Sequence, residues 1–226
     1  MTAGVVAYKI CDRGFDCEHC PLDIGLRGAD WPLVPRRGRI RPETTAFRFP
    51  DDRLYLPAHT WARPVDEDRV RCGIDAFGAG LLRHASALVL PAAGATVEQG
   101  RVGFWLSAHG RPVPFLSPVS GRVERRNRLA QKRPILVARA SYDEGWLLEV
   151  HCRDWSEQRS RLVDSARIKQ RTRRDMQLLG DQLSRSLAPP GSSLGRTMAD
   201  GGQPLFDFLD AIDPERFRKL IMPLLV

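Results

Sequence analysis

The sequence predicts a mainly β fold with α-helices appended at its C-terminal end. Between residues 55 and 150, short apolar runs are separated by Gly and Pro turns about every eight to twelve residues, which is typical of β-barrels and sandwiches. After Cys152 the apolar residues recur at spacings of three and four instead, as they do along one face of a helix. This change of period predicts a β domain followed by helices.

The apolar runs predict strands and one short helix within the β domain. The helix is expected over residues 75–83, and the strands over 70–73, 86–90, 101–106, 113–116, 121–125, 135–138 and 146–150. Segments 90–94 and 117–121 each place a proline three residues before a glycine, whose conformational freedom suits a tight turn. This repeat predicts two related hairpins in a small two-sheet sandwich.

Two helices are expected beyond the β domain. The first ends before Pro189 and carries an apolar stripe of Met176, Leu179, Leu183 and Leu187. The second begins with Asp213 as its N-cap and Pro214 as its first helical residue. Its apolar face comprises Phe217, Leu220, Ile221 and Leu224. We expect this face to dock on the β domain; the alternative is that it binds a partner or a second copy.

The composition is that of an ordinary globular protein, with 226 residues of which 42% are hydrophobic and 27% charged. No apolar run approaches the ~18 residues that cross a bilayer, and residues 1–7 lack a secretory pattern. A soluble, cytoplasmic protein without a membrane partner is expected. The predicted segments are a Cys-rich head over 1–28, a Pro/Arg-rich linker over 29–54, the β domain over 55–165 and a helical extension over 166–226.

The formal net charge of +8 is carried almost entirely by arginine, because the chain has only four lysines. A GC-rich genome alone produces such a bias. The basic stretches over 36–41, 122–133 and 167–174 are not interleaved with aromatic residues, so nucleic acid is not an expected partner. The sequence also lacks a Ser-His-Asp set, a phosphate-binding Gly loop and an HExxH pattern, which favours a protein that is not an enzyme.

Three cysteines are crowded near the start of the chain, at Cys11, Cys17 and Cys20. A Cys-x-x-Cys pair with a third thiol nearby suits a metal site that lacks one ligand. Candidates for the fourth ligand are His19, Asp23 and, more remotely, Cys152, His151 or His59. Zinc and an iron-sulfur cluster are both compatible with this pattern. A redox pair or structurally incidental cysteines are the alternatives.

Several motifs of the β region occur together in a fixed order. They are His59-Thr60-Trp61, VRCGIDAF over 70–77, LPAAGATVEQG over 90–100, SPVSG over 117–121 and YDEGWL over 142–147. In order and spacing they resemble the H protein family of the glycine cleavage system, over residues 55–165. The resemblance implies a barrel-sandwich hybrid of the lipoyl- and biotinyl-carrier type. In that fold a lysine at a hairpin tip carries a lipoyl arm between the other enzymes of glycine cleavage.

The lysine that the resemblance implies falls on Gly110, ten residues after Gly100 and seven before Ser117. Neither flanking residue, His109 or Arg111, offers a primary amine that could form the lipoyl amide. We therefore predict no lipoate and a non-catalytic module that binds a protein partner. The alternative is a carrier modified elsewhere, or an accessory component of a lipoate-dependent pathway that binds a lipoylated partner.

Overall fold

The computed structural model describes residues 47–108, 110–187 and 213–225. The chain divides into two compact units, residues 1–41 and 42–226, and every described residue belongs to the second unit. The predicted Cys head and most of the predicted linker therefore lie outside the described residues.

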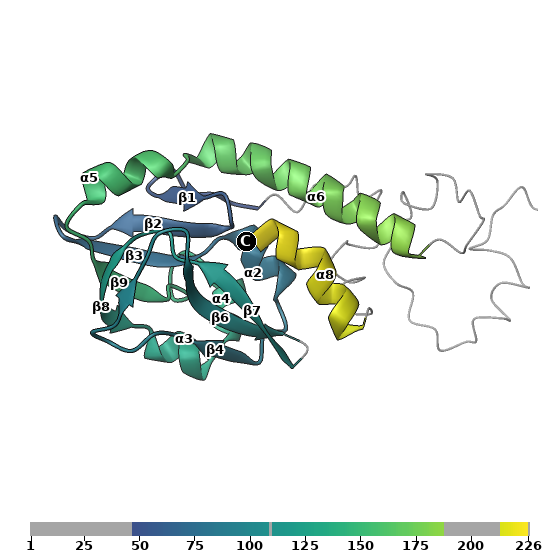
Figure 1. Cartoon of the computed structure of the whole chain (residues 1–226), viewed down its shortest axis with the longest axis horizontal. Coiled ribbons are helices and arrows are strands. Elements are labelled where there is room, and N and C mark those ends of the chain that lie inside the picture. Colours follow the sequence, from purple (N-terminus) through teal and green to yellow (C-terminus); the bar gives the residue numbers. More distant parts are fainter. Residues whose placement is uncertain (1–46, 109, 188–212, 226) are drawn as a thin grey trace, which may run out of the picture. The chain divides into compact units, whose positions relative to one another are not determined.

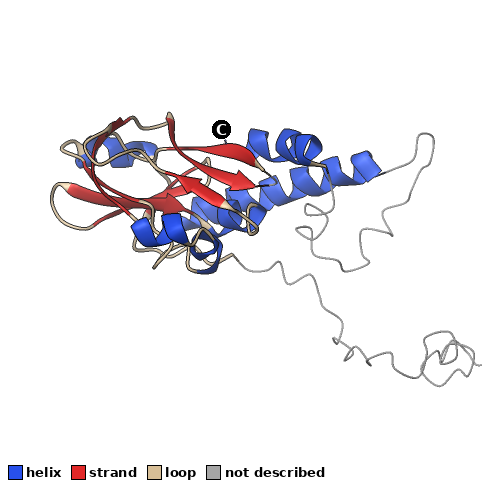
Figure 2. Ribbon diagram, turned by 90° about the horizontal axis from the view of Figure 1, so that it is seen from below, coloured by secondary structure: helices blue, strands red, loops and turns tan. Residues whose placement is uncertain are grey.

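Two antiparallel sheets form the body of the fold (Figures 1 and 2), which confirms the predicted mainly β architecture. The six-stranded sheet has the order β1-β2-β3-β9-β8-β5, and the three-stranded sheet has the order β4-β6-β7. The strands of the first are β1 (Leu54–Leu56), β2 (Thr60–Pro64), β3 (Arg69–Ile74), β9 (Leu148–His151), β8 (Gly121–Arg126) and β5 (Thr96–Val97). Those of the second are β4 (Ala87–Val89), β6 (Val102–Ala108) and β7 (Arg111–Leu116).

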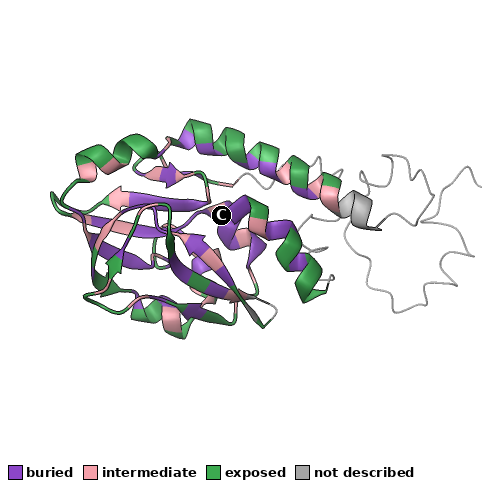
Figure 3. Ribbon diagram, in the orientation of Figure 1, coloured by how far each residue is buried: buried purple, intermediate pink, exposed green. Residues whose placement is uncertain are grey.

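A single apolar core lies between the inner faces of the two sheets (Figure 3). Alternate residues of each strand enter it, as the period of two in a β-strand requires. Its fully buried side chains include Ile74 and Leu148 from the six-stranded sheet and Phe104 and Phe115 from the three-stranded sheet. Trp61 is buried on the opposite face of the six-stranded sheet, where its indole nitrogen donates to the carbonyls of Ile74 and Ser141, at 3.0 and 3.1 Å.

The two repeated turn segments lie side by side in the structure. β5 follows the first and β8 follows the second, and these strands pair antiparallel, with Val97 opposite Gly121. Gly121 is required at this point because a Cβ atom there would lie 2.1 Å from the carbonyl oxygen of His151 in β9. The repeat in the sequence therefore corresponds to a paired arrangement in space.

The helix expected over 75–83 is present as α2 (Ala76–Leu81), capped by Asp75, whose Oδ1 accepts from the Gly78 amide at 2.8 Å. The strand expected over 135–138 is wrong, because these residues form the helix α4 (Ile135–Arg139). Four consecutive apolar residues do not distinguish a buried strand from a helix. The neighbouring helix α3 (Arg128–Lys132) was not expected either; the side chain of Asn127 caps it by accepting from the amides of Leu129 and Ala130.

Among the described residues, the helical segments after β9 are α5 (Trp155–Gln158), a 3-10 turn (Arg159–Arg161), α6 (Ser165–Leu187) and α8 (Pro214–Leu225). The predicted docking of the last helix on its own β domain is confirmed, since α8 contacts β7 and α6. Its buried residues are Phe217, Leu220, Ile221, Leu224 and Leu225. Within the described ranges, none of the helices is both long enough and apolar enough to cross a membrane.

Candidate functional site

The β6–β7 hairpin ends in a turn of two residues, because Ala108 pairs with Arg111. Two-residue hairpin turns need residues with positive φ, and Gly110 has a φ of 73°. No atom lies within 4 Å of where a Cβ of Gly110 would stand, so the position is open to solvent. The structure thus places Gly110 at the tip of the hairpin, while its neighbour His109 lies outside the described residues.

A primary amine is absent from this tip among the residues that the structure describes. The described lysines are Lys132 on α3, Lys169 on α6 and Lys219 on α8, so each belongs to a helix and not to the hairpin. Glycine offers no group that an acyl arm could be attached to. The residues present at the tip therefore do not fit a covalently bound lipoyl group.

A chain of charged groups, buried except for Arg171, joins three elements. His59, in the turn between β1 and β2, lies between two carboxylates: its Nδ1 is 2.9 Å from Asp75, and its Nε2 is 3.1 Å from Asp175 on α6. All three side chains are 0 or 1% exposed. The Nε of Arg171 donates to the same Asp175 oxygen at 2.7 Å. We call these four residues the His59 cluster.

The charge of His59 follows from its two neighbours. Burial by itself lowers the pKa of His59, but the carboxylates of Asp75 and Asp175 outweigh it and raise that pKa to about 9. A protonated imidazole donates from both nitrogens, as this geometry requires. With Arg171 included, two positive charges then balance two negative ones, and the cluster fastens α6 to α2 and to the start of β2.

A second charged cluster covers the outer face of the six-stranded sheet. The carboxylate of Glu149 on β9 is 1% exposed and accepts from Arg71 at 2.6 Å and from Arg125 at 3.0 Å. The Trp146 ring lies against both guanidinium groups, 4.9 and 5.7 Å from their central carbons. This arrangement neutralises a buried charge and ties β3, β8 and β9 together, which is a structural role.

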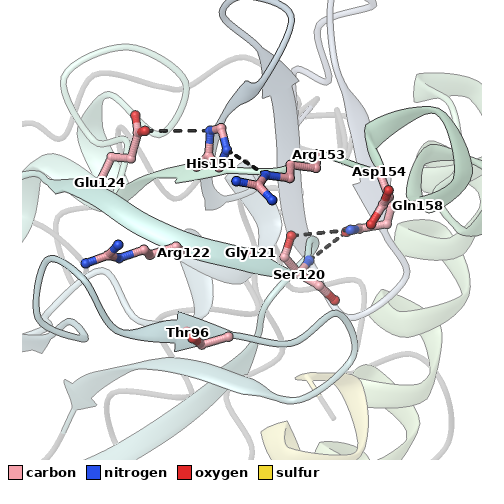
Figure 4. Close-up of a pocket in the computed structure, with 9 residues that line it drawn as sticks. All are labelled: Thr96, Ser120, Gly121, Arg122, Glu124, His151, Arg153, Asp154 and Gln158. Carbon is pink, nitrogen blue, oxygen red and sulfur yellow. Dashed lines mark hydrogen bonds and ion pairs between the residues drawn. The ribbon is translucent and has the colours of Figure 1, made fainter.

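An open depression of about 520 Å³ lies at the end of β8, next to α5 (Figure 4). Arg153 donates to Nε2 of His151 at 3.4 Å, and the other ring nitrogen of His151 is 3.7 Å from Glu124. Gln158 accepts from the Ser120 amide at 2.6 Å. The lining groups thus carry charges of both signs and largely bind one another, which suits a solvated surface better than a site of chemistry.

The predicted metal ligands Cys11, Cys17, Cys20, His19 and Asp23 lie outside the described residues, and the metal site stays a prediction. Cys152 is fully buried, and burial raises the pKa of its thiol. Burial also raises the pKa of the Cys72 thiol. Among the described residues, His, Cys, Asp and Glu side chains nowhere gather in a group of three or more that could hold a metal ion.

The His59 cluster was not apparent from the sequence, because its members are 16 and 116 residues apart. The sole local sign is the His-x-Trp motif at His59, since a histidine beside a buried tryptophan is a candidate for burial. The sequence gives a clearer indication of the second charged cluster, which comprises Glu149, Arg71 and Arg125. A carboxylate within the apolar run from Leu147 to Val150 requires a partner of opposite charge.

A two-sheet antiparallel sandwich that presents a tight hairpin is the fold of the lipoyl-carrier class. A solved structure supports this assignment. The H protein of the glycine cleavage system from Mycobacterium marinum matches with a TM-score of 0.50 and 24% identity, covering 55% of this chain and 98% of the other. At that identity the likeness shows the fold alone.

The chain belongs to the glycine cleavage H-protein family, whose model matches residues 53–175, more than half of its length. The H protein of a Synechococcus strain is 32% identical over 120 residues, which cover 53% of this chain and 91% of the relative. A probable H protein from Natronomonas pharaonis is 35% identical over 105 residues, which cover 46% and 82% of the two chains. The resemblance noted in the sequence is thereby confirmed.

Proposed function

We propose that this chain is a non-catalytic interaction module of the H-protein family that works without a lipoyl arm. The observation that carries the proposal is Gly110 at the tip of the β6–β7 hairpin. Members of the family act as carriers within a multi-enzyme system, so they already have surfaces that bind other proteins. A member without an acylated tip keeps those surfaces and loses the transfer chemistry.

The local backbone supports this proposal. A lysine at position 110 would have to adopt a φ near 73°, which costs about 1–2 kcal/mol for a residue with a Cβ atom. The backbone conformation of the tip therefore favours glycine over lysine at position 110.

The test is the intact mass of the full chain after expression with lipoate and lipoylating enzymes. The H protein of the Synechococcus relative, expressed in the same cells, shows that the enzymes are active. We expect this chain to keep its unmodified mass and a Gly110→Lys variant to gain one lipoyl mass, since the strain of about 1–2 kcal/mol leaves the domain folded.

A lipoyl mass on the wild-type chain would overturn the proposal, and peptide mapping would then identify which of its four lysines is modified. A Gly110→Lys variant that stays unmodified, while the Synechococcus relative is lipoylated in the same cells, would contradict a different step of the reasoning. It would show that the enzymes reject the whole tip and that the missing amine is not the reason.

A further inference from the structure

The outer face of the three-stranded sheet carries no charged side chain at any position that the structure describes. Neighbouring positions across the sheet are Val89, Trp105 and Pro114 in one row and Ala87, Ser107 and Pro112 in the next. Val89 is 53% exposed and Trp105 is 38% exposed. The alternate residues of the same strands, such as Leu88, Leu106 and Val113, are buried in the core. We call these six outward residues the outer hairpin face.

Such a surface is unusual for an antiparallel sheet with one face in water. Sheets of that kind normally alternate apolar residues inward with polar residues outward. Here the hydroxyl of Ser107 is the one polar side chain among the six. The outer face of the six-stranded sheet differs sharply, because Arg71, Arg125 and Glu149 occupy it. A contiguous apolar patch that is kept in water indicates a binding surface.

Positive charges border this face. Helix α3 packs beside β4 and presents Arg128 and Lys132, with Arg133 directly after it; all three are exposed. None of them is within 4 Å of a carboxylate in the described part of the chain. An apolar centre with a charged rim is the usual anatomy of a protein–protein interface. A nucleic-acid surface would instead carry its positive charge across the centre.

We infer that the outer hairpin face, with its α3 border, is the docking surface for an acidic partner protein. The inference rests on the proposed function and names the surface that this function uses. The border favours an acidic partner because opposite charges complement each other and steer association. A second copy of this chain would bring an equally basic border and a net charge of +8. Repulsion between the two copies therefore makes a second copy a less favourable ligand for this surface than an acidic protein.

The experiment places a photo-reactive amino acid at position 105 of the full chain in its native cells. A control chain carries the same group at Gln170, which is exposed on α6. We expect position 105 to cross-link to an acidic protein that mass spectrometry identifies, and position 170 not to cross-link to it. The inference would be overturned if position 105 cross-linked to a second copy or to nucleic acid, or if it formed no cross-link at all.

Binding of that purified partner to the full chain then tests the energetics. Trp105→Ala should weaken binding at least tenfold, because exposed aromatic side chains at the centre of an interface supply much of its affinity. The charge reversal of Arg128 and Lys132 to Glu should weaken it and flatten its salt dependence. The same reversal of Arg167 and Lys169 on α6, an identical change in net charge, should leave the affinity within about twofold.

Equal effects of the two reversals would contradict the assigned surface, as would an unchanged affinity for Trp105→Ala. Each variant is compared with wild type by thermal unfolding, and an unchanged midpoint shows that the fold is intact. The two proposals fail separately. A lipoyl mass on the wild-type chain removes the proposed function, whereas a partner bound through another face removes this surface and leaves that function standing.

Discussion

The buried imidazole of His59 should make the stability of this protein depend on alkaline pH. Its pKa is about 9 in the folded chain, against an ordinary value of 6.5. The folded state therefore holds this proton more tightly than the unfolded state. The stabilisation is complete below pH 6.5 and is lost as the pH rises through 9. At 1.36 kcal/mol for each pKa unit, the difference amounts to roughly 3 kcal/mol, most of it lost between pH 7 and 10.

Urea unfolding of the full chain at several pH values between 6 and 10 measures this loss. The matched variant is His59→Asn, which has no group that titrates in this range. Asparagine tolerates the positive φ of 62° at this position better than most residues. The variant should be less stable than wild type at pH 7, because Asp75 and Asp175 then face each other, and Arg171 is the one positive partner left to them among the described residues.

The difference in unfolding free energy between the two proteins isolates His59 from every other group that titrates. We expect this difference to shrink by about 2–3 kcal/mol between pH 7 and 10. Parallel pH curves for the two proteins would refute the reasoning. So would an imidazole signal that titrates near or below pH 6.5 in the folded protein, since the two carboxylates would then not hold the proton.

Two further outcomes follow from single side chains. Thr172 is buried and its hydroxyl has no hydrogen-bond partner among the described residues, so Thr172→Val should be neutral or slightly stabilising. Thr60→Val, which removes a 3.0 Å hydrogen bond to a carbonyl, should cost about 1–2 kcal/mol in urea unfolding. Phe217→Ala should release α8, whose amides would then exchange hydrogen at least tenfold faster, because burial of an aromatic ring contributes about 3–5 kcal/mol. Lys219→Ala, at a 75% exposed position on the same helix, should leave that exchange unchanged.

The parts of the fold that the sequence predicts are those that local pattern controls. The strands around Val70, Val113 and Val150 show the alternation of β-structure, and Asp213-Pro214 marks the start of α8 through capping chemistry alone. β1 and β5 have three and two residues, too few for any period to be visible. Their strand conformation depends on pairing with a neighbour that is distant in the sequence.

The candidate site divides in the same way. The place of Gly110 follows from counting along the chain, because two anchors in the sequence agree on it. The His59 cluster depends on α6 packing across the start of β2, and the spacing of residues carries no information about that contact. The bare outer hairpin face also needed the structure, since only strand register shows that Val89, Trp105 and Pro114 are neighbours.

The prolines of β7 have a consequence for how the chain behaves at high concentration. β7 is an edge strand, and pairs along an antiparallel ladder alternate between bonded and non-bonded positions. Counting from the pair that closes the hairpin, Pro112 and Pro114 fall on the non-bonded positions. Their nitrogens point away from β6 and carry no hydrogen, so the edge of β7 is a poor template for another strand. β7 can therefore border an apolar sheet face while offering few donors for pairing with a strand of another chain.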